Sequence, residues 1–134
     1  DTDRSRGLGD VYKRQMIEYF EGNERMHQII SYKGMLFLSG QTFPSADSIE
    51  EQTVGALNKI DRLLADHGSS KDYILSVHIF LRDMALFARF NRIYDEWVSK
   101  TNQPTRCCVE ARMATEKHLV ELVVTAVQKD FANK

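Results

Sequence analysis

Near the end of the chain, two short segments carry side chains that can do chemistry. Residues 104–110 read Pro-Thr-Arg-Cys-Cys-Val-Glu, and residues 120–122 read Val-Glu-Leu. Side chains alternate between the two faces of a β-strand, so Arg106, Cys108 and Glu110 are expected to share one face of a first strand. A guanidinium offers a planar fork of hydrogen-bond donors, which suits a bidentate grip on a carboxylate.

The second strand is predicted over residues 119–128 and has one fully apolar face. The polar stretch 114–118 allows the two strands to form an antiparallel pair, which would bring Arg106 and Glu121 together on the side away from the apolar core. A carboxylate inside such a strand needs a partner. Arg106 or Arg112 could simply neutralise Glu121, or Glu121 could orient an attacking water.

The cysteines and histidines show no metal-site or disulfide pattern. Cys107 and Cys108 are adjacent and point to opposite faces of a strand, so a bond between them would be strained. We expect two free thiols in a reducing compartment, with Cys107 in the core. Four histidines lack metal-ligand spacing: His27, His67, His78 and His118.

The composition indicates one soluble domain. A chain of 134 residues can bury a single core, and 43% hydrophobic with 28% charged residues is ordinary for a globular protein. The net charge of −1 offers no basic footprint for nucleic acid, and no apolar run reaches membrane-spanning length. With free thiols and no recognisable secretory signal, a cytoplasmic location is predicted.

The first fifteen residues differ from the rest. They are polar, lack periodicity and precede Met16. Residues 10–15, Asp-Val-Tyr-Lys-Arg-Gln, are also what the transposon end used in sequencing-library preparation encodes in one frame. We therefore expect residues 1–15 to be a non-native or disordered leader and residues 16–134 to form the single domain. Such an artefact would suggest that the protein comes from an environmental (metagenome) bacterial source. A natural disordered tail is the alternative.

Periodicity and turn signals predict six strands and two helices. A tight turn is expected at Lys33-Gly34, and a helix runs from the capping box of Ser48 and Glu51 to Gly68. A second helix follows Asp83, which can cap it. The strands are expected at 17–21, 28–32, 35–39, 73–81, 106–112 and 119–128.

The predicted order is β-β-β-α-β-α-β-β, an α+β class in which two amphipathic helices cover one face of the sheet. In the strand 73–81, one face would carry Leu75, Val77, Ile79 and Leu81. The uncovered face would mix Arg106, Cys108 and Glu121 with apolar residues such as Phe80 and Val123. Such a mixed face is a natural oligomerisation surface.

The segment 104–114, Pro-Thr-Arg-Cys-Cys-Val-Glu-Ala-Arg-Met-Ala, followed by Val-Glu-Leu, resembles the signature of the RidA/YjgF family of reactive-intermediate imine deaminases. Phe-Leu-Ser-Gly-Gln at 37–41 and Phe-Ala-Arg-Phe-Asn at 87–91 extend the resemblance upstream. It covers roughly residues 16–128 and is nearest to the YoaB-like branch. It implies the chorismate-mutase-like fold and a homotrimer with inward-facing sheets and ligand clefts between subunits.

The resemblance also implies an activity: cofactor-free, metal-free hydrolysis of 2-imino or 2-enamino acids to 2-keto acids and ammonia. Arg106 matches the family's substrate-carboxylate arginine, and Glu121 would orient the attacking water. No histidine can be assigned beside Cys108 as a base, so its main-chain carbonyl is expected to hold the water or the departing nitrogen. The substrate would further contact Ser39, Gly40, Met26 and Asn91.

Met26 departs from the family pattern, because many members carry Tyr there. A thioether in place of a phenol removes a hydrogen-bond donor and leaves a flexible apolar wall, which leaves the substrate side chain open. One alternative function is a non-catalytic trimer that binds small carboxylates or partner proteins, which needs Arg106 but not Glu121. Another is a chorismate-mutase-like enzyme, which would call for more cations than Arg106 and perhaps Arg112.

Overall fold

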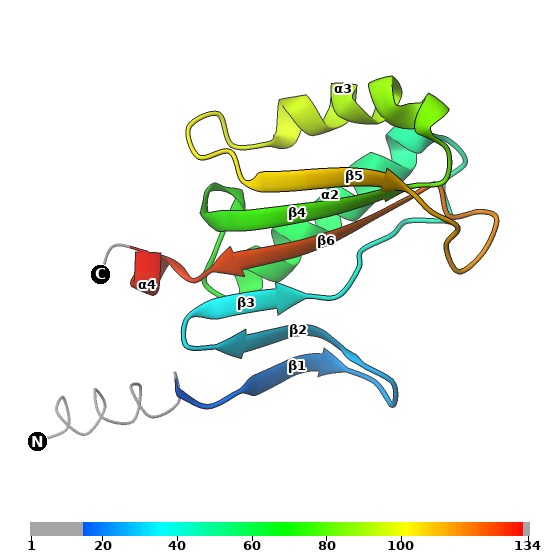
Figure 1. Ribbon diagram of the computed structural model, residues 1–134. Helices are drawn as coiled ribbons and strands as arrows, with labels where there is room; N and C mark the ends of the chain where they lie inside the picture. The colour runs from blue at the N-terminus through cyan, green and yellow to red at the C-terminus, as the bar shows by residue number, and fades with distance from the viewer. Residues whose placement is uncertain (1–14, 133–134) are drawn as a thin grey trace, which may run out of the picture.

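The computed structural model describes residues 15–132 and consists of a six-stranded sheet with helices against one face (Figure 1). The order of the main elements confirms the predicted α+β class; the short α4 was not predicted. The strands are β1 (Glu18–Gly22), β2 (His27–Tyr32), β3 (Met35–Leu38), β4 (Ile74–Leu81), β5 (Thr105–Glu110) and β6 (Val120–Val127). The helices are α2 (Ile49–Asp66), η1 (Lys71–Tyr73), η2 (Met84–Leu86), α3 (Phe87–Trp97) and α4 (Lys129–Ala132).

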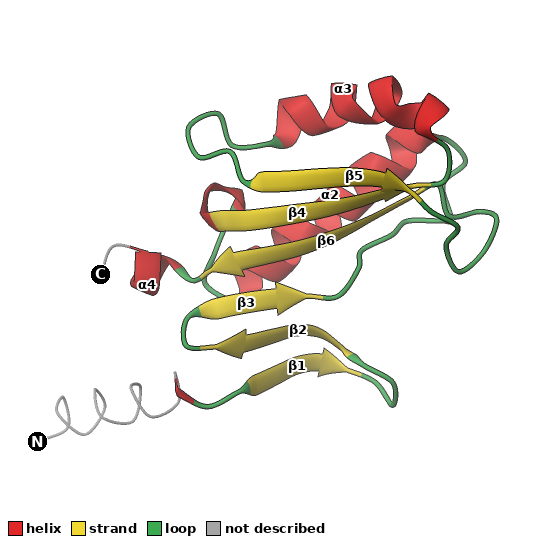
Figure 2. Cartoon of the chain, in the orientation of Figure 1, coloured by secondary structure: helices red, strands yellow, loops and turns green. Residues whose placement is uncertain are grey.

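The strand order in the sheet is β1-β2-β3-β6-β4-β5, with β4 and β5 parallel and the other neighbours antiparallel. The prediction that the last two strands pair is therefore wrong, because β4 lies between them. The helix α3 joins β4 to β5 as a crossover, which is the connection that a parallel pair needs. In Figure 2, α2 passes behind β4 and β6, while α3 lies beside β5 at the far edge from β1.

Local signals set the ends of these elements as predicted. The turn between β2 and β3 has φ of 51° at Lys33 and 82° at Gly34. At the start of α2, the Glu51 N–H donates to Ser48 Oγ at 3.1 Å. At its end, Gly68 adopts φ 82° and the following N–H reaches back into the last helical turn. Asp83 accepts a backbone hydrogen bond at the start of η2, which continues into α3. Each of these signals acts within a few residues, which is why the sequence reveals it.

The core lies between the sheet and α2 and α3. One register prediction for β4 is wrong: a β-bulge between Ile74 and Ser76 shifts the alternation of its side chains. As a result Ile74 is buried, whereas Leu75 is 45% exposed. The core is formed by residues such as Ile29, Leu36, Leu57, Ile60, Leu64, Ile74, Val77, Ile79, Leu81, Phe90, Val120, Leu122 and Val124.

The sheet face away from the helices carries large apolar side chains. Phe37 is 45% exposed and Val109 is 46% exposed. Phe37 pairs with Thr125, and Val109 with Phe80, which places them on the same face. An uncovered face of this kind is consistent with the predicted homotrimer, which stays a prediction. Within residues 15–132, no helix combines the length and apolarity needed to cross a bilayer. Almost all of the predicted leader lies outside the described residues.

Candidate functional site

Arg106 points toward the helices, not toward the open face of the sheet. It pairs in register with Val77, which is fully buried in the core. Its Nη2 donates to Asn91 Oδ1 at 2.9 Å. Its Cζ lies 4.8 Å from the ring centre of Tyr94 and 5.8 Å from that of Phe87. Strand β5 and helix α3 therefore build one half of the site together.

Helical spacing explains why α3 presents three side chains to Arg106. Phe87, Asn91 and Tyr94 are separated by four and three residues, so they lie along one face of the helix. The start of the helix is tied to the same strand, because Glu110 Oε1 accepts from the Met84 N–H at 2.9 Å. The strand that carries Arg106 thus also holds the helix that contacts it.

The two cysteines lie on opposite faces of β5. Cys108 pairs with Ile79 and packs against the core, so burial raises the pKa of its thiol, with the charge of Arg106 opposing the rise. A raised pKa disfavours the thiolate that a nucleophile would need. Cys107 is exposed, so its predicted place in the core is wrong. It pairs with His78 on the face that no helix covers.

Glu121 lies on the open face, opposite to Arg106. It pairs with Phe80 across the β4–β6 ladder. It is packed against Gly40, because a Cβ added at Gly40 would lie 2.3 Å from Glu121 Oε2. Among residues 15–132 no cation forms an ion pair with Glu121, so neither Arg106 nor Arg112 neutralises it. The absence of a side chain at Gly40 makes room for this carboxylate.

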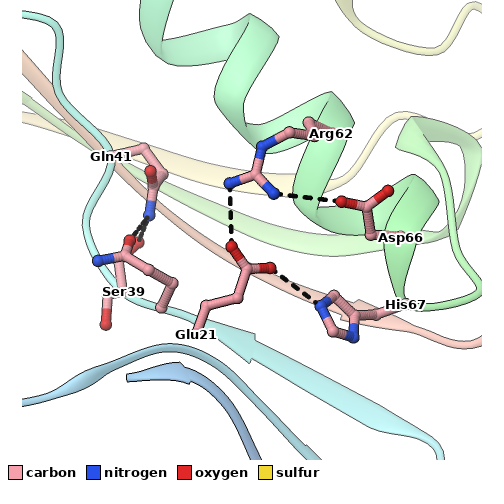
Figure 3. A network of polar contacts seen from close by, with 7 residues as sticks. Glu21, Ser39, Gln41, Arg62, Asp66 and His67 are labelled. Carbon is pink, nitrogen blue, oxygen red and sulfur yellow. Dashed lines mark hydrogen bonds and ion pairs between the residues drawn. The ribbon is translucent and has the colours of Figure 1, made fainter. Parts of the chain in front are cut away.

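Ser39 and Gln41 hold the backbone around Gly40 in place. The Ser39 hydroxyl donates to the His27 carbonyl at 2.6 Å. Figure 3 shows Gln41, whose Nε2 donates to the Ser39 carbonyl and to Gln28 Oε1, each at 2.9 Å. Gln41 is buried and was missed as a site residue, although it stands in the Ser-Gly-Gln segment. The Ser39 hydrogen is engaged within the chain, so a ligand would meet its oxygen lone pair.

Met26 immediately precedes β2 and is 39% exposed. Asn23 shapes the turn before it, because its side-chain oxygen accepts from the Met26 N–H at 2.9 Å. The next residue, His27, carries the carbonyl that Ser39 contacts. Met26 is therefore a neighbour of the Ser39 segment, on the Glu121 half of the site.

A polar network anchors the hairpin that carries Met26 (Figure 3). Glu21, at the end of β1, pairs with Arg62 of α2 at 3.1 Å and with His67 Nε2 at 3.2 Å. Arg62 also pairs with Asp66 at 3.1 Å. The hydrogen bonds from Arg62 and then His67 lower the pKa of the Glu21 carboxyl. The edge strand β1 is thereby tied to the C-terminal turn of α2.

The described residues thus form two sets. The guanidinium set contains Arg106, Asn91, Tyr94, Phe87 and Cys108; the carboxylate set contains Glu121, Gly40, Ser39 and Met26. Arg106 and Glu121 lie two strands apart across the sheet and three residues apart along the strands. Their backbones are therefore separated by about 10 Å across the sheet and by about 10 Å along it. Their side chains point to opposite faces of the sheet. The prediction that both share one face is wrong.

Three surface hollows lined by described residues lie away from both sets. Hollows of about 390, 540 and 190 Å³ lie at the Phe43 loop, beside the start of β5, and between α2 and α3. Neither Arg106 nor Glu121 lines any of these three. Within residues 15–132, no cluster of three or more His, Cys, Asp or Glu side chains could hold a metal ion. The two sets therefore remain separate within the described part of the chain, with Arg106 and Glu121 on opposite faces of the sheet.

Comparison with known proteins identifies the family of this chain. The sequence model of the family described as Endoribonuclease L-PSP matches residues 18–128. A RutC family protein of Haemophilus ducreyi is 35% identical over 113 residues, which cover 83% of this chain and 96% of the relative. RutC family protein YoaB of Escherichia coli is 32% identical over 106 residues, which cover 79% and 93%.

A crystal structure of a YjgF family member from Neisseria meningitidis superimposes with a TM-score of 0.85 and 39% identity, covering 87% of this chain and 98% of that one. An uncharacterised Pseudomonas aeruginosa protein gives a TM-score of 0.81 at 34% identity, covering 85% and 100%. The chain therefore belongs to the Endoribonuclease L-PSP family, the RidA/YjgF proteins. The family and the fold inferred from residues 104–122 are both confirmed.

Proposed function

We propose that the protein hydrolyses reactive 2-imino and 2-enamino acids to 2-keto acids and ammonia. One observation carries the proposal: Arg106 is partly buried, and among residues 15–132 no carboxylate forms an ion pair with it. A cation in such a place without a partner favours an anionic ligand. One of its N–H groups is engaged by Asn91, and the rest of the fork is available for a substrate carboxylate.

The chemistry needs mainly a positioned water. Glu121 accepts a hydrogen bond from this water, and the Cys108 carbonyl accepts another from the water or from the departing nitrogen. A 2-enamino acid first tautomerises to the 2-imino acid, gaining a proton at C3 and losing one from nitrogen. The water oxygen then forms a bond to C2 of the imine, the two water protons pass to the nitrogen, the C2–N bond breaks, and ammonia and the 2-keto acid leave. Because such imines already hydrolyse in water, positioning that removes a few kcal/mol from the barrier supplies a factor of about 10² to 10³.

Two copies of the chain are needed to apply both sets to one substrate. Arg106 and Glu121 face opposite sides of the sheet, so one chain cannot direct both at the same carbon atom. We therefore place the reaction in clefts where the guanidinium set of one copy meets the carboxylate set of another. The apolar open face around Phe37 and Val109 supports assembly, and the family resemblance favours a homotrimer.

Substitutions should separate binding from hydrolysis. Arg106→Ala should weaken both, and Arg106→Lys should rescue little, because a point charge does not reproduce the fork. Glu121→Gln should retain ligand binding while hydrolysis slows. In the assay, an amino-acid oxidase supplies imines with varied side chains, and the release of keto acid measures turnover. Binding of pyruvate measures how well Arg106 holds a carboxylate. Hydrolysis at the wild-type rate by Glu121→Gln would contradict the proposal that Glu121 orients the attacking water.

A second candidate is a non-catalytic carboxylate-binding protein. It is favoured by the guanidinium set being complete within one chain, independent of Glu121. In that case the wild type binds pyruvate but adds nothing to the spontaneous hydrolysis of any imine tested. Cleavage of RNA, named in the family description, is less favoured, because a net charge of −1 gives this chain no overall attraction for a polyanion.

A further inference from the structure

We propose that Phe87 and Tyr94 form an aromatic cradle that orients the guanidinium fork of Arg106 and thereby sets the selection for carboxylates. The inference deepens the proposed function and rests on it. Both rings are positioning residues: they act on the ligand through Arg106. They lie two helical turns apart on the same face of α3, with Asn91 between them.

The contacts are those of a cation held against aromatic faces. Arg106 Cζ lies 4.8 Å from the centre of the Tyr94 ring and 5.8 Å from that of Phe87. Both distances are within the range in which a guanidinium is attracted by a ring. Asn91 Oδ1 adds one directional contact, at 2.9 Å from Nη2. Two faces and one hydrogen bond leave the fork few orientations.

Tyr94 cannot readily move away from Arg106. It is 3% exposed, and its ring centre lies 5.7 Å from those of both Phe90 and Trp97. Trp97 is fixed in turn, because its Nε1–H is shared between the two carboxylate oxygens of Asp61 on α2, at 3.0 and 3.1 Å. The position of the guanidinium is thus determined from α2 through two rings. Phe87 is 37% exposed and contacts Arg106 from the solvent-exposed start of α3.

Aromatic faces stabilise a cation without neutralising it. A carboxylate in the place of Tyr94 would pair with Arg106 and compete with the substrate. Burial raises the pKa of the Tyr94 phenol, so the ring stays uncharged in neutral solution and the positive charge remains for the ligand. A ring attracts the guanidinium without carrying a negative charge, so N–H groups of Arg106 other than the one bound to Asn91 can meet a carboxylate in two parallel hydrogen bonds.

The test measures pyruvate binding by calorimetry with the complete, assembled protein. Phe87→Leu and Tyr94→Leu should each weaken binding by about three- to tenfold, whereas Tyr94→Phe, which keeps the ring and loses only the hydroxyl beside Arg106, should weaken binding by less than Tyr94→Leu does. Phe43→Leu is the matched control, because the Phe43 ring lies 5.4 Å from the Lys59 ammonium, far from Arg106 along the chain. It should leave pyruvate binding unchanged.

A double-variant cycle shows whether the rings act through Arg106. In an Arg106→Ala background, Phe87→Leu should have no further effect on pyruvate binding. An equal loss in both backgrounds would mean that the ring contacts the ligand directly and would overturn the cradle. Unchanged binding in Phe87→Leu alongside a loss in Arg106→Ala also overturns it but leaves the proposed function intact. Unchanged binding in Arg106→Ala removes the proposed function itself. If Tyr94→Leu does not fold, the exposed Phe87 carries the test.

Discussion

The two halves of the candidate site are built in different ways. Arg106 is enclosed by its own chain, with a hydrogen bond to Asn91 and two aromatic rings around it. Glu121 stands on the uncovered face, opposite Phe80 and beside the space left by Gly40, and no cation among residues 15–132 forms an ion pair with it. Under the proposed function, one folded chain prepares recognition of the carboxylate, whereas placement of the water depends on what covers the open face.

The largest expected effect comes from disrupting that open face. Phe37→Glu places a charge among exposed apolar side chains and should convert an assembly of three 15.5 kDa chains into single chains. Keto-acid release should fall by about 100-fold, because the two sets no longer meet. Light scattering and circular dichroism check mass and fold. Val54→Glu, at a residue of α2 that is about as exposed as Phe37, is the control and should change neither the mass of the assembly nor keto-acid release. A monomer with full hydrolysis would place the complete site in one chain.

Mixing two inactive variants should restore part of the activity. Arg106→Ala and Glu121→Ala should each be inactive alone, but chains refolded together at equal amounts should regain about a quarter of wild-type hydrolysis, since one in four clefts then combines both intact sets. Arg106→Ala mixed with the Arg106→Ala/Glu121→Ala double variant should stay inactive. Absence of recovery despite proven mixing would contradict a site shared between copies.

A smaller effect is expected when Glu121 is displaced without being removed. In Gly40→Ala the added Cβ would lie 2.3 Å from Glu121 Oε2, and this carboxylate is the flexible end that must move. Hydrolysis should slow by about tenfold while pyruvate binding by Arg106 is kept, because only the water's position changes. Gly55→Ala crowds Phe43 to a similar degree at a distance from both sets, and hydrolysis by the folded variant should not change.

The smallest effect is expected at Cys108. Cys108→Ser should change hydrolysis by less than about twofold, because the proposed role belongs to the main chain and burial raises the pKa of the thiol. Cys107→Ser, on the opposite face of β5, is the control. Thermal melting confirms that both variants are folded. Loss of activity in folded Cys108→Ser alone would instead identify a thiol nucleophile.

Much of the fold follows from short stretches of sequence. The cap at Ser48, the left-handed Gly68 and the turn at Lys33-Gly34 each act within a few residues, and all three are where the sequence predicts them. Alternation along one strand is equally local, so Arg106 and Cys108 do share a face. The wrong assignment of Leu75 has a local cause as well, a bulge that shifts the alternation by one position.

The sequence by itself determined the order of the elements, their caps and which side chains of one strand lie together, because these depend on contacts between near neighbours in the chain. Only the tertiary structure decided that β4 separates β5 from β6, and hence that Arg106 and Glu121 face opposite ways. The reason is that whether side chains on β5 and β6 share a face depends on how each of these strands pairs with β4, which lies between them. The packing of α3 against β5 then turned Arg106 toward the helices, where Tyr94 and Asn91 hold it.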